Sequence, residues 1–458
     1  MVPAPTDPTT LLRTGGCPGI RGGHALLVRQ TTSTATKVGV LARIGRRGFV
    51  ATAAGALAAV TAAGDAAAVP GKAPRGAGRR RAAREFRGMW VASVENRDWP
   101  TQRGLSAARQ RAELRGLLDS AVERRLNTVI FQVRPAADAL WPSPHEPWSE
   151  YLTGTQGRDP GWDPLGTAVR EAHARGLELH AWFNPYRVAV HGDPTRLVSS
   201  HPARRHPEWV VPYGGKLYYN PGLPEVRAFV QDAMADAVRR YDIDGVHFDD
   251  YFYPYPVAGQ VFDDDDAWAR HGSGHSDRAA WRRSNIDLLV REMRTRIGAL
   301  KKDIPFGISP FGVWRNASTD PLGSDTQAGV QTYDDLHADV RRWVREGWID
   351  YVVPQVYWNM GFAPADYEKL VPWWASVAAG TGVDLYIGEA LYKVGAEGQP
   401  AAWHDPAELS RHLTFADRYE EVGGHCFFSA REVTADPLGA MTRVVADHYP
   451  ARARAPRR

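Results

Sequence analysis

Cysteine is nearly absent from this chain. Only Cys17 and Cys426 occur among 458 residues, too few for a disulfide framework or a cysteine-ligated zinc site. If an N-terminal segment carrying Cys17 is removed, no intramolecular disulfide can form. The folded part must then be stabilised by its core, which a chain of this length with 43% hydrophobic residues can supply.

Several motifs of cofactor-dependent enzymes are also missing. No glycine-rich dinucleotide loop follows the first apolar run, and there is no phosphate-binding loop and no Gly-x-Ser-x-Gly elbow. These absences count against nucleotide-dependent enzymes and esterases. The acidic run 263–266 lacks the spacing and central glycine of an EF-hand loop, so we interpret it as a solvated loop, with a calcium site as the lesser alternative. We expect no bound metal and no cofactor.

Charge of one sign does not dominate the centre of the chain. The net charge is +4, and arginines are concentrated near 75–84 and 452–458, whereas the middle is mixed in sign. This distribution argues against a nucleic-acid-binding protein, and an anionic cell-wall surface would suit the basic ends equally well. Aromatic residues are abundant instead: 16 Trp and 17 Tyr offer flat rings that either stack on sugars or fill a large core.

The N-terminal region resembles an export signal. Arg46 and Arg47 directly precede a weakly apolar run over 49–63, and Ala66 begins an A-x-A cleavage site. The apolar run is too short to span a bilayer, so we expect no integral membrane span. The pattern over 43–68 is typical of a twin-arginine signal peptide, the alternative being a disordered tail rich in Ala and Arg. We therefore expect export, to the outside of the cell or to the cell wall.

From residue 85 onward, short apolar runs alternate with helical segments. The eight runs are 86–93, 128–135, 177–185, 245–251, 305–312, 351–358, 385–391 and 426–431. The helical patterns cover 106–125, 164–175, 224–241, 278–300, 334–346, 364–379 and 405–422. This alternation predicts an α/β fold, a (β/α)8 TIM-type barrel with enlarged βα loops, rather than an open doubly wound sheet. The barrel forms one catalytic domain over 85–450, after an extension, signal and linker over 1–84.

Polar side chains gather at the ends of the predicted strands, where a TIM barrel builds its active site. Residues two apart on a strand share a face. The shared faces carry Gln132 and Arg134; His180, Trp182 and Asn184; His247, Asp249 and Tyr251; and Gln355 and Tyr357. We expect these side chains to point into the mouth of the barrel.

Carboxyl groups at these ends indicate glycoside hydrolysis. One carboxyl group donates a proton to the leaving oxygen, and a second attacks the anomeric carbon or activates water. Asp249 is the predicted ionised carboxylate, and Glu389 is the first choice of proton donor, followed by Asp250 and Asp138. Structural alternatives exist for each: the Asp249–Asp250 pair can cap a loop, Glu389 can pair with an arginine, and His247 can be a core histidine.

The predicted substrate-binding set combines aromatic rings with hydrogen-bonding groups. It comprises Arg134, Asp138, Trp182, Asn184, Tyr186, His247, Gln355, Tyr357 and Trp358. Flat rings stack on sugar faces, while amide, imidazole and charged groups bond to hydroxyls. The expected partner is therefore a polysaccharide or other glycan.

Six segments resemble one known family. They are 85–91 (Glu-Phe-Arg-Gly-Met-Trp-Val), 132–135 (Gln-Val-Arg-Pro), 147–154 (Pro-Trp-Ser-Glu-Tyr-Leu-Thr-Gly), 181–187 (Ala-Trp-Phe-Asn-Pro-Tyr-Arg), 244–251 (Asp-Gly-Val-His-Phe-Asp-Asp-Tyr) and 354–358 (Pro-Gln-Val-Tyr-Trp). Together they resemble the bacterial glycosyl-hydrolase-like family ten over residues 85–445. The resemblance implies a TIM barrel, an extracytoplasmic location and glycoside hydrolase activity, with peptidoglycan strands of the cell wall as one substrate class.

The fourth run also resembles a segment of the wider α-amylase-like barrels. Gly245-x-His247-x-Asp249 has the spacing of their Gly-x-Arg-x-Asp, in which the Asp is the nucleophile. His replaces Arg, and no Glu ends the fifth run, where those enzymes keep their acid.

Two other functions stay open at this point. One is a non-catalytic carbohydrate-binding barrel that uses Trp90, Trp182, Tyr186, Tyr357 and Trp358 as stacking platforms. The other is polysaccharide deacetylation, which usually needs a metal.

Overall fold

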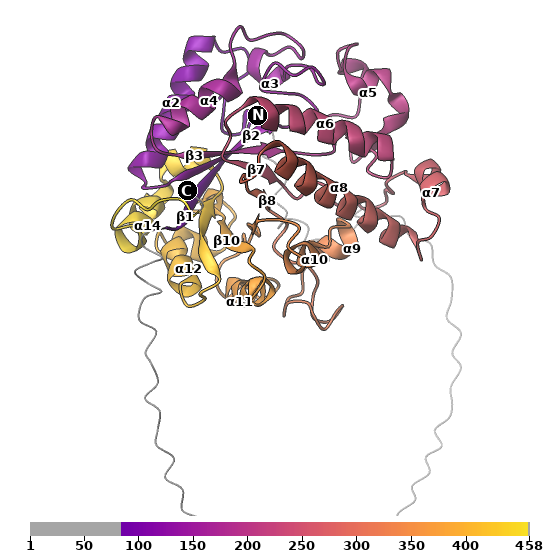
Figure 1. The fold of residues 1–458 in the computed structure, drawn as a ribbon. Helices are drawn as coiled ribbons and strands as arrows, with labels where there is room; N and C mark the ends of the chain where they lie inside the picture. The colour runs from indigo at the N-terminus through magenta and orange to yellow at the C-terminus, as the bar shows by residue number, and fades with distance from the viewer. Residues whose placement is uncertain (1–83, 457–458) are drawn as a thin grey trace, which may run out of the picture. The chain divides into compact units, whose positions relative to one another are not determined.

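Eight parallel strands close into a barrel, as the alternating pattern predicts (Figure 1). The computed structural model describes residues 84–456, and the predicted export signal and Cys17 lie outside them. The barrel strands are β1 (Phe86–Val91), β2 (Thr128–Arg134), β3 (Glu178–Phe183), β7 (Gly245–Phe248), β8 (Phe306–Ile308), β9 (Tyr351–Val352), β10 (Asp384–Glu389) and β11 (Val422–Phe427). They pair in this order around the barrel, and β11 closes it against β1. The (β/α)8 prediction is confirmed.

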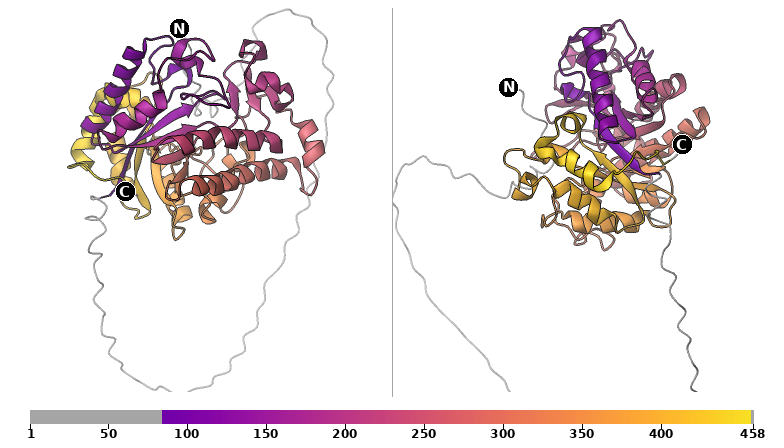
Figure 2. Two further views of the ribbon diagram at one scale, coloured as in Figure 1. Left: turned by 45° about the horizontal axis from the view of Figure 1, so that its top comes forward. Right: turned by 90° about the vertical axis from the view of Figure 1, so that its left-hand side faces the viewer.

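Helices between the strands cover the outside of the barrel (Figure 2). They include α2 (Ala107–Glu123), α4 (Pro164–His173), α6 (Pro224–Arg240), α8 (Arg278–Leu300), α10 (Val340–Arg345), α11 (Tyr367–Ala378), α12 (Glu408–Ala416), α13 (Ala430–Ala435) and α14 (Ala440–His448). Local sequence fixes their starts: the side chain of Ser106 accepts from the Arg109 amide, and that of Asp163 accepts from the Gly166 amide. Across residues 84–456, every helix is too short or too polar to cross a bilayer.

Two predicted helices are shorter in the structure. The pattern over 334–346 divides into α9 (Thr332–Asp335) and α10, because His337 adopts a left-handed φ of 52°. The pattern over 405–422 was too long at both ends. α12 ends at Ala416, and Val422 is already the first buried residue of β11.

A small antiparallel sheet follows β3, and the sequence pattern did not predict it. Its strands are β4 (Arg187–Ala189), β5 (Val210–Tyr213) and β6 (Lys216–Tyr219), in the order β4-β6-β5. Gly214 and Gly215 form the hairpin turn between β5 and β6 with φ of 57° and 72°, a region that favours glycine. Arg187 lies opposite Tyr218 in the register. This sheet carries the chain from the end of β3 along the side of the barrel mouth.

The interior of the barrel is packed largely with aromatic side chains. Its buried apolar residues are Phe86, Trp90, Ala92, Ile130, Trp182, Tyr351, Val353, Tyr386 and Cys426. Phe86 and Tyr386 stack with ring centroids 4.1 Å apart. Gly307 leaves room for the Tyr351 ring, since an added Cβ would lie 2.1 Å from it. The barrel interior is therefore a filled core and not a pore.

The acidic run 263–266 is not simply a solvated loop. Asp264 is buried, and its carboxylate pairs with Arg282 of α8 at 2.6 Å. Asp265 and Asp266 begin the short helix α7 (Asp265–His271). The interpretation of a solvated loop was therefore wrong for Asp264, which ties this loop to α8.

Candidate active site

Asp249 lies at the C-terminal end of β7 and accepts hydrogen bonds from β3. Trp182 Nε1 donates to its Oδ2 at 2.9 Å, and Asn184 Nδ2 lies 3.1 and 3.2 Å from the two carboxyl oxygens. The backbone amide of Tyr251 donates to Oδ1 at 3.2 Å. Trp182, Asn184 and Asp249, which the strand pattern placed in the mouth, are therefore brought together by adjacent strands.

Opposing effects act on the charge of Asp249. Burial raises the pKa of this carboxyl group above its ordinary value, and Arg187 and the hydrogen bonds from Trp182, Tyr251 and Asn184 offset this rise only in part. Arg187 is fixed nearby, because its Nε and Nη2 both donate to the Pro135 carbonyl at 3.0 and 2.9 Å. Strand-end reasoning did not place Arg187 in the site, although it belongs to the 181–187 segment.

Asp250 lies beside Asp249 but has different partners. The Tyr255 hydroxyl donates to its carboxylate, and the Gln355 side chain also hydrogen-bonds to it. Burial and the neighbouring charge of Asp249 raise the pKa of Asp250 to about 6, against the effect of these two bonds. Gln355 was predicted for the site, whereas Tyr255 was missed because it comes from the loop after β7. The end of β7 thus carries one carboxyl group surrounded by donors and one poised to hold a proton.

His247 lies inside the barrel, where three polar groups of the interior hold it. Its Nδ1 lies 3.1 Å from the Tyr351 hydroxyl and its Nε2 lies 2.9 Å from Ser309 Oγ. Trp90 Nε1 donates to His247 Nε2 at 3.3 Å. Burial, with a smaller effect of His180, lowers the pKa of His247 well below its ordinary value. It is a neutral, fully buried side chain on the floor of the site, which matches the core-histidine alternative.

Among the predicted aromatic residues, Tyr357 lies close to the carboxyl groups. Its ring lies 6.1 Å from that of Phe428, and the charge of Asp250 is among the causes that raise its pKa, after burial and two other neighbours. Trp358 instead packs edge-on against Phe311, with centroids 5.3 Å apart. The charges of both Asp250 and Glu389 thus act on Tyr357, whereas Trp358 packs against Phe311 in the core.

Tyr186 is also outside the mouth. It is fully buried in the large core between barrel and helices. The charges that act on its hydroxyl are those of Arg227 on α6 and Glu292 on α8, with a smaller effect of Arg134. The two helices lie side by side on this flank (Figure 1). The prediction that Tyr186 binds substrate is therefore corrected: its ring contributes to packing.

Arg134 does not point into the mouth, because β2 and β3 shift register before it. Gln132 lies opposite Trp182, but Arg134 lies opposite Phe183, which faces out of the barrel. Its guanidinium forms a fully buried ion pair with Glu146, at 2.5 and 2.7 Å, and donates to the Pro185 carbonyl at 3.0 Å. Arg134 therefore braces the loop that follows Asn184 and has no free group for substrate.

Asp138 lies in the loop after β2 and bonds within that loop. It accepts from the Ala136 amide at 3.2 Å and from the Ser149 side chain. Burial, with a smaller effect of Glu146, raises the pKa of Asp138 to about 7 against these bonds. Its described contacts are to its own loop rather than to the end of β7.

Glu389 ends β10, but its side chain lies outside the barrel. The Tyr367 hydroxyl of α11 donates to Oε1 at 2.8 Å, His425 Nδ1 lies 2.9 Å from the same oxygen, and His412 Nδ1 of α12 lies 2.8 Å from Oε2. Gly388 occupies the inward position instead, since a Cβ on it would lie 3.1 Å from the Trp90 ring.

The electrostatics of Glu389 also oppose its predicted role. Burial alone would raise its pKa, but the charges and hydrogen bonds of His412 and His425 lower it to about 2. A group this acidic is ionised at neutral pH and has no proton to donate. The expectation that Glu389 is the proton donor is therefore corrected, because strand parity and two histidines make it part of a buried ionic cluster behind the barrel.

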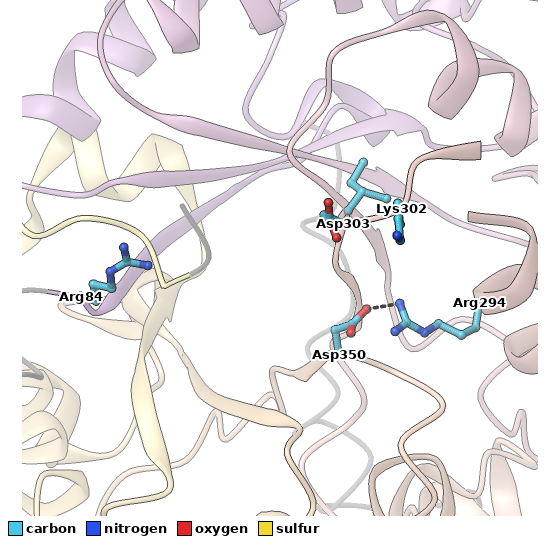
Figure 3. A pocket seen from close by; sticks show the side chains of 6 residues that line it. Arg84, Arg294, Lys302, Asp303 and Asp350 are labelled. Atoms are coloured by element: carbon cyan, nitrogen blue, oxygen red, sulfur yellow. Dashed lines mark hydrogen bonds and ion pairs between the residues drawn. The ribbon is translucent and has the colours of Figure 1, made fainter. Parts of the chain in front are cut away.

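A solvent-accessible hollow of about 470 Å³ lies at the opposite end of the barrel (Figure 3). Its lining residues are Arg84, Arg294, Lys302, Asp303, Ile304 and Asp350. They precede β1, β8 and β9 or belong to α8, so the hollow is at the N-terminal ends of the strands. Arg294 pairs with Asp350, whose Oδ2 also accepts from the Phe306 amide at 2.9 Å. These contacts hold strand starts, and this end of a TIM barrel is associated with stability rather than catalysis.

The mouth is narrow in this structure. Asp249 and Asp250 are only 3% and 5% exposed, whereas Tyr251, Tyr255 and Gln355 around them are half-buried.

Comparisons with known proteins agree with this architecture. The chain is 49% identical over 368 residues to "Glycosyl hydrolase YngK" of Bacillus subtilis, covering 80% of this chain and 72% of that protein. It is 39% identical over 363 residues to "Glycosyl hydrolase DigH" of Escherichia coli K12, covering 75% and 82%. Among solved structures, the PgaB (BpsB) glycoside hydrolase domain of Bordetella bronchiseptica aligns with a TM-score of 0.52 at 14% identity, over 81% of this chain and all of that domain.

The solved structure shares the fold, and the family follows from sequence. The family model described as "Glycosyl hydrolase-like 10" matches residues 85–405, which contain β1 to β10 and the carboxyl groups at the end of β7. The motifs that resembled this family lie within the matched range. The chain belongs to the glycosyl hydrolase-like 10 family.

Proposed function

We propose that the protein is a glycoside hydrolase in which Asp249 is the ionised carboxylate and Asp250 is the proton donor. The observation that carries this proposal is the contrast between two adjacent carboxyl groups at the end of β7. Asp249 accepts hydrogen bonds from Trp182, Asn184 and a backbone amide, whereas the pKa of Asp250 is raised to about 6. Neighbouring carboxyl groups with different hydrogen-bond partners serve as acid and base in glycosidases.

The chemistry follows from these protonation states. Asp250 gives its proton to the glycosidic oxygen as the bond from that oxygen to the anomeric carbon breaks. Asp249 in its ionised form, which accepts hydrogen bonds from Trp182 and Asn184, either attacks the anomeric carbon or takes a proton from the attacking water. Gln355 and Tyr255 orient Asp250, and Asn184 and Trp182 orient Asp249. Water is consumed and two shorter glycans are released.

The proposed substrate is a cell-wall glycan, and the proposed location is outside the cytoplasm. Support for export comes from the paired Arg46 and Arg47 ahead of an apolar run. Support for a glycan comes from membership of the family and from the aromatic rings Trp182 and Tyr357 beside the carboxyl groups. Peptidoglycan strands are the glycan that an exported protein of this kind would meet at the cell wall.

A panel of polysaccharides tests the proposal. Purified protein is incubated with peptidoglycan strands stripped of peptides, and separately with chitin oligosaccharides and other polysaccharides, and the products are read by mass spectrometry. We expect shorter fragments that carry one added water from at least one glycan. The matched controls are D249N, which should give no product, and K302M at the opposite end of the barrel, which should behave as the wild type. No product from any glycan would contradict the proposal.

A further inference from the structure

Two cations at the side of the mouth have no carboxylate partner. Lys216 is half-buried, and within residues 84–456 it makes no ion pair or hydrogen bond through its amine. Arg187 is 6% exposed, and in the same described region its guanidinium bonds only to the Pro135 carbonyl and lies 4.9 Å from the centre of the Tyr251 ring. Removing a cation from water without a counter-ion costs free energy, so this pair requires an explanation.

The small sheet places both cations on one face. Arg187 on β4 lies opposite Tyr218 on β6, and Lys216 is two residues from Tyr218 on the same strand. Residues two apart on a strand share a face, and diagonal neighbours across two strands lie about 7–8 Å apart. The register shifts after Arg187, but the charge of Arg187 still lowers the pKa of Lys216, so the two cations lie near one another.

The same face borders the candidate catalytic residues. Arg187 is the charge that most lowers the pKa of Asp249 without forming an ion pair with it. Burial and the nearby Arg187 lower the pKa of Lys216, and the exposed Glu95 has a smaller opposite effect. Within the described residues, neither cation forms an ion pair with Asp249 or with Glu95.

We propose that Lys216 and Arg187 form a subsite for a carboxylate carried by the sugar next to the bond that is cleaved. The proposal rests on the proposed glycoside hydrolysis and specifies its substrate as an acidic saccharide. Arg187 offers the group a planar donor beside Tyr251, and half-buried Lys216 offers a cation that solvent can reach.

Binding measurements with paired ligands test this subsite. The first pair is a tetrasaccharide of alternating N-acetylglucosamine and N-acetylmuramic acid and the same compound with its carboxyl groups reduced to alcohols. The second pair is a hyaluronan tetrasaccharide and its carboxyl-reduced form, which separates a lactyl carboxylate from a uronic one. Calorimetry uses the full chain with D250N, because an asparagine resembles the uncharged form of Asp250 and leaves Asp249 and Arg187 unchanged.

The expected result is that at least one carboxylated ligand binds about tenfold or more tightly than its reduced form. Adding K216M should remove that preference, adding K216R should retain it, and the matched charge loss K302M at the far end of the barrel should leave it unchanged. Equal affinity for both members of each pair, or a preference that survives K216M, would overturn the subsite.

The outcome separates this subsite from the proposed function. If the wild type cleaves charged and reduced glycans at equal rates, the subsite is disproved but the hydrolase activity is supported. If binding depends on the carboxylate and on Lys216 but the wild type gives no product, the hydrolase activity is disproved and the binding site is supported.

Discussion

Acidic residues lie at the ends of both β7 and β10, but they differ in where their side chains lie and in the direction in which their pKa values are shifted. At β7, Asp249 and Asp250 lie at the barrel mouth beside neutral donors from β3, β9 and the following loop, and burial raises both pKa values. At β10, Glu389 lies behind the barrel against two histidines, and its pKa is lowered to about 2.

The comparison shows that position at a strand end is not enough to define a catalytic acid. Strand parity decides whether the side chain enters the barrel, and the charge of its neighbours decides whether it holds a proton. Glu389 fails both conditions, because Gly388 takes the inward position and His412 supplies a charge. Asp250 meets the second condition, since its nearest charge is another carboxylate.

Replacing Asp249 with asparagine should have the largest effect. Hydrolysis should fall by about 10³- to 10⁴-fold, the upper range for removing a positioned catalytic group, because an amide cannot attack a sugar or accept a proton from water. Circular dichroism should show that the fold persists. Hydrolysis by D249N at more than about a tenth of the wild-type rate would show that Asp249 is not the catalytic carboxylate.

Replacing Asp250 with asparagine should cost about 10²- to 10³-fold and change the pH dependence. Wild-type activity should fall as the pH rises through about 6, because the proton that Asp250 donates is then lost. The loss in D250N should be smaller for aryl glycosides with good leaving groups, which need little protonation. An equal loss for all leaving groups would assign Asp250 a different role.

Replacing Glu389 with glutamine should leave activity within about twofold at a temperature where the protein is folded, but lower the free energy of unfolding by about 3 kcal/mol. Removing one member of a buried ionic cluster leaves the others uncompensated, and here His412 would keep only Glu408, 3.3 Å from its Nε2. Urea denaturation measures this. The control E346Q removes an exposed pair with Arg342 and should change stability by less than about 0.5 kcal/mol. A loss of activity well beyond twofold in folded E389Q would show that Glu389 takes part in catalysis.

The stability difference between the wild type and E389Q should also depend on pH. The folded-state pKa of Glu389 is lowered from its ordinary 4.5 to about 2, so its contribution is present above about pH 4.5 and is lost as the pH falls towards 2. The difference in unfolding free energy between wild type and E389Q should therefore shrink over that window. A difference that stays constant down to pH 2 would mean that the cluster is not ionic.

Sequence reasoning located the barrel well, because each apolar run corresponds to one strand. Period-two alternation also placed Trp182, Asn184 and Asp249 near one another, since β3 and β7 are adjacent and in register there. Those placements depend only on local pattern and on the geometry of a closed barrel.

The position of the other side chains depends on tertiary contacts that the local sequence pattern does not show. Arg134 was misplaced because a register shift between β2 and β3 cannot be read from either strand alone. Glu389 was misplaced because its side chain points outward, to partners on the two helices that flank β10 in sequence. Tyr255 and the β4-β6-β5 sheet were missed because long βα loops lack the regular spacing that marks strands and helices.

The most direct test compares three variants on one glycan. D249N, D250N and E389Q are incubated beside the wild type with the glycan that the panel identifies, below the unfolding temperature of each, and products are counted by mass spectrometry. The account predicts product from the wild type and E389Q and little or none from the two aspartate variants. Product from D249N at the wild-type level, or loss of product in folded E389Q alone, would contradict it.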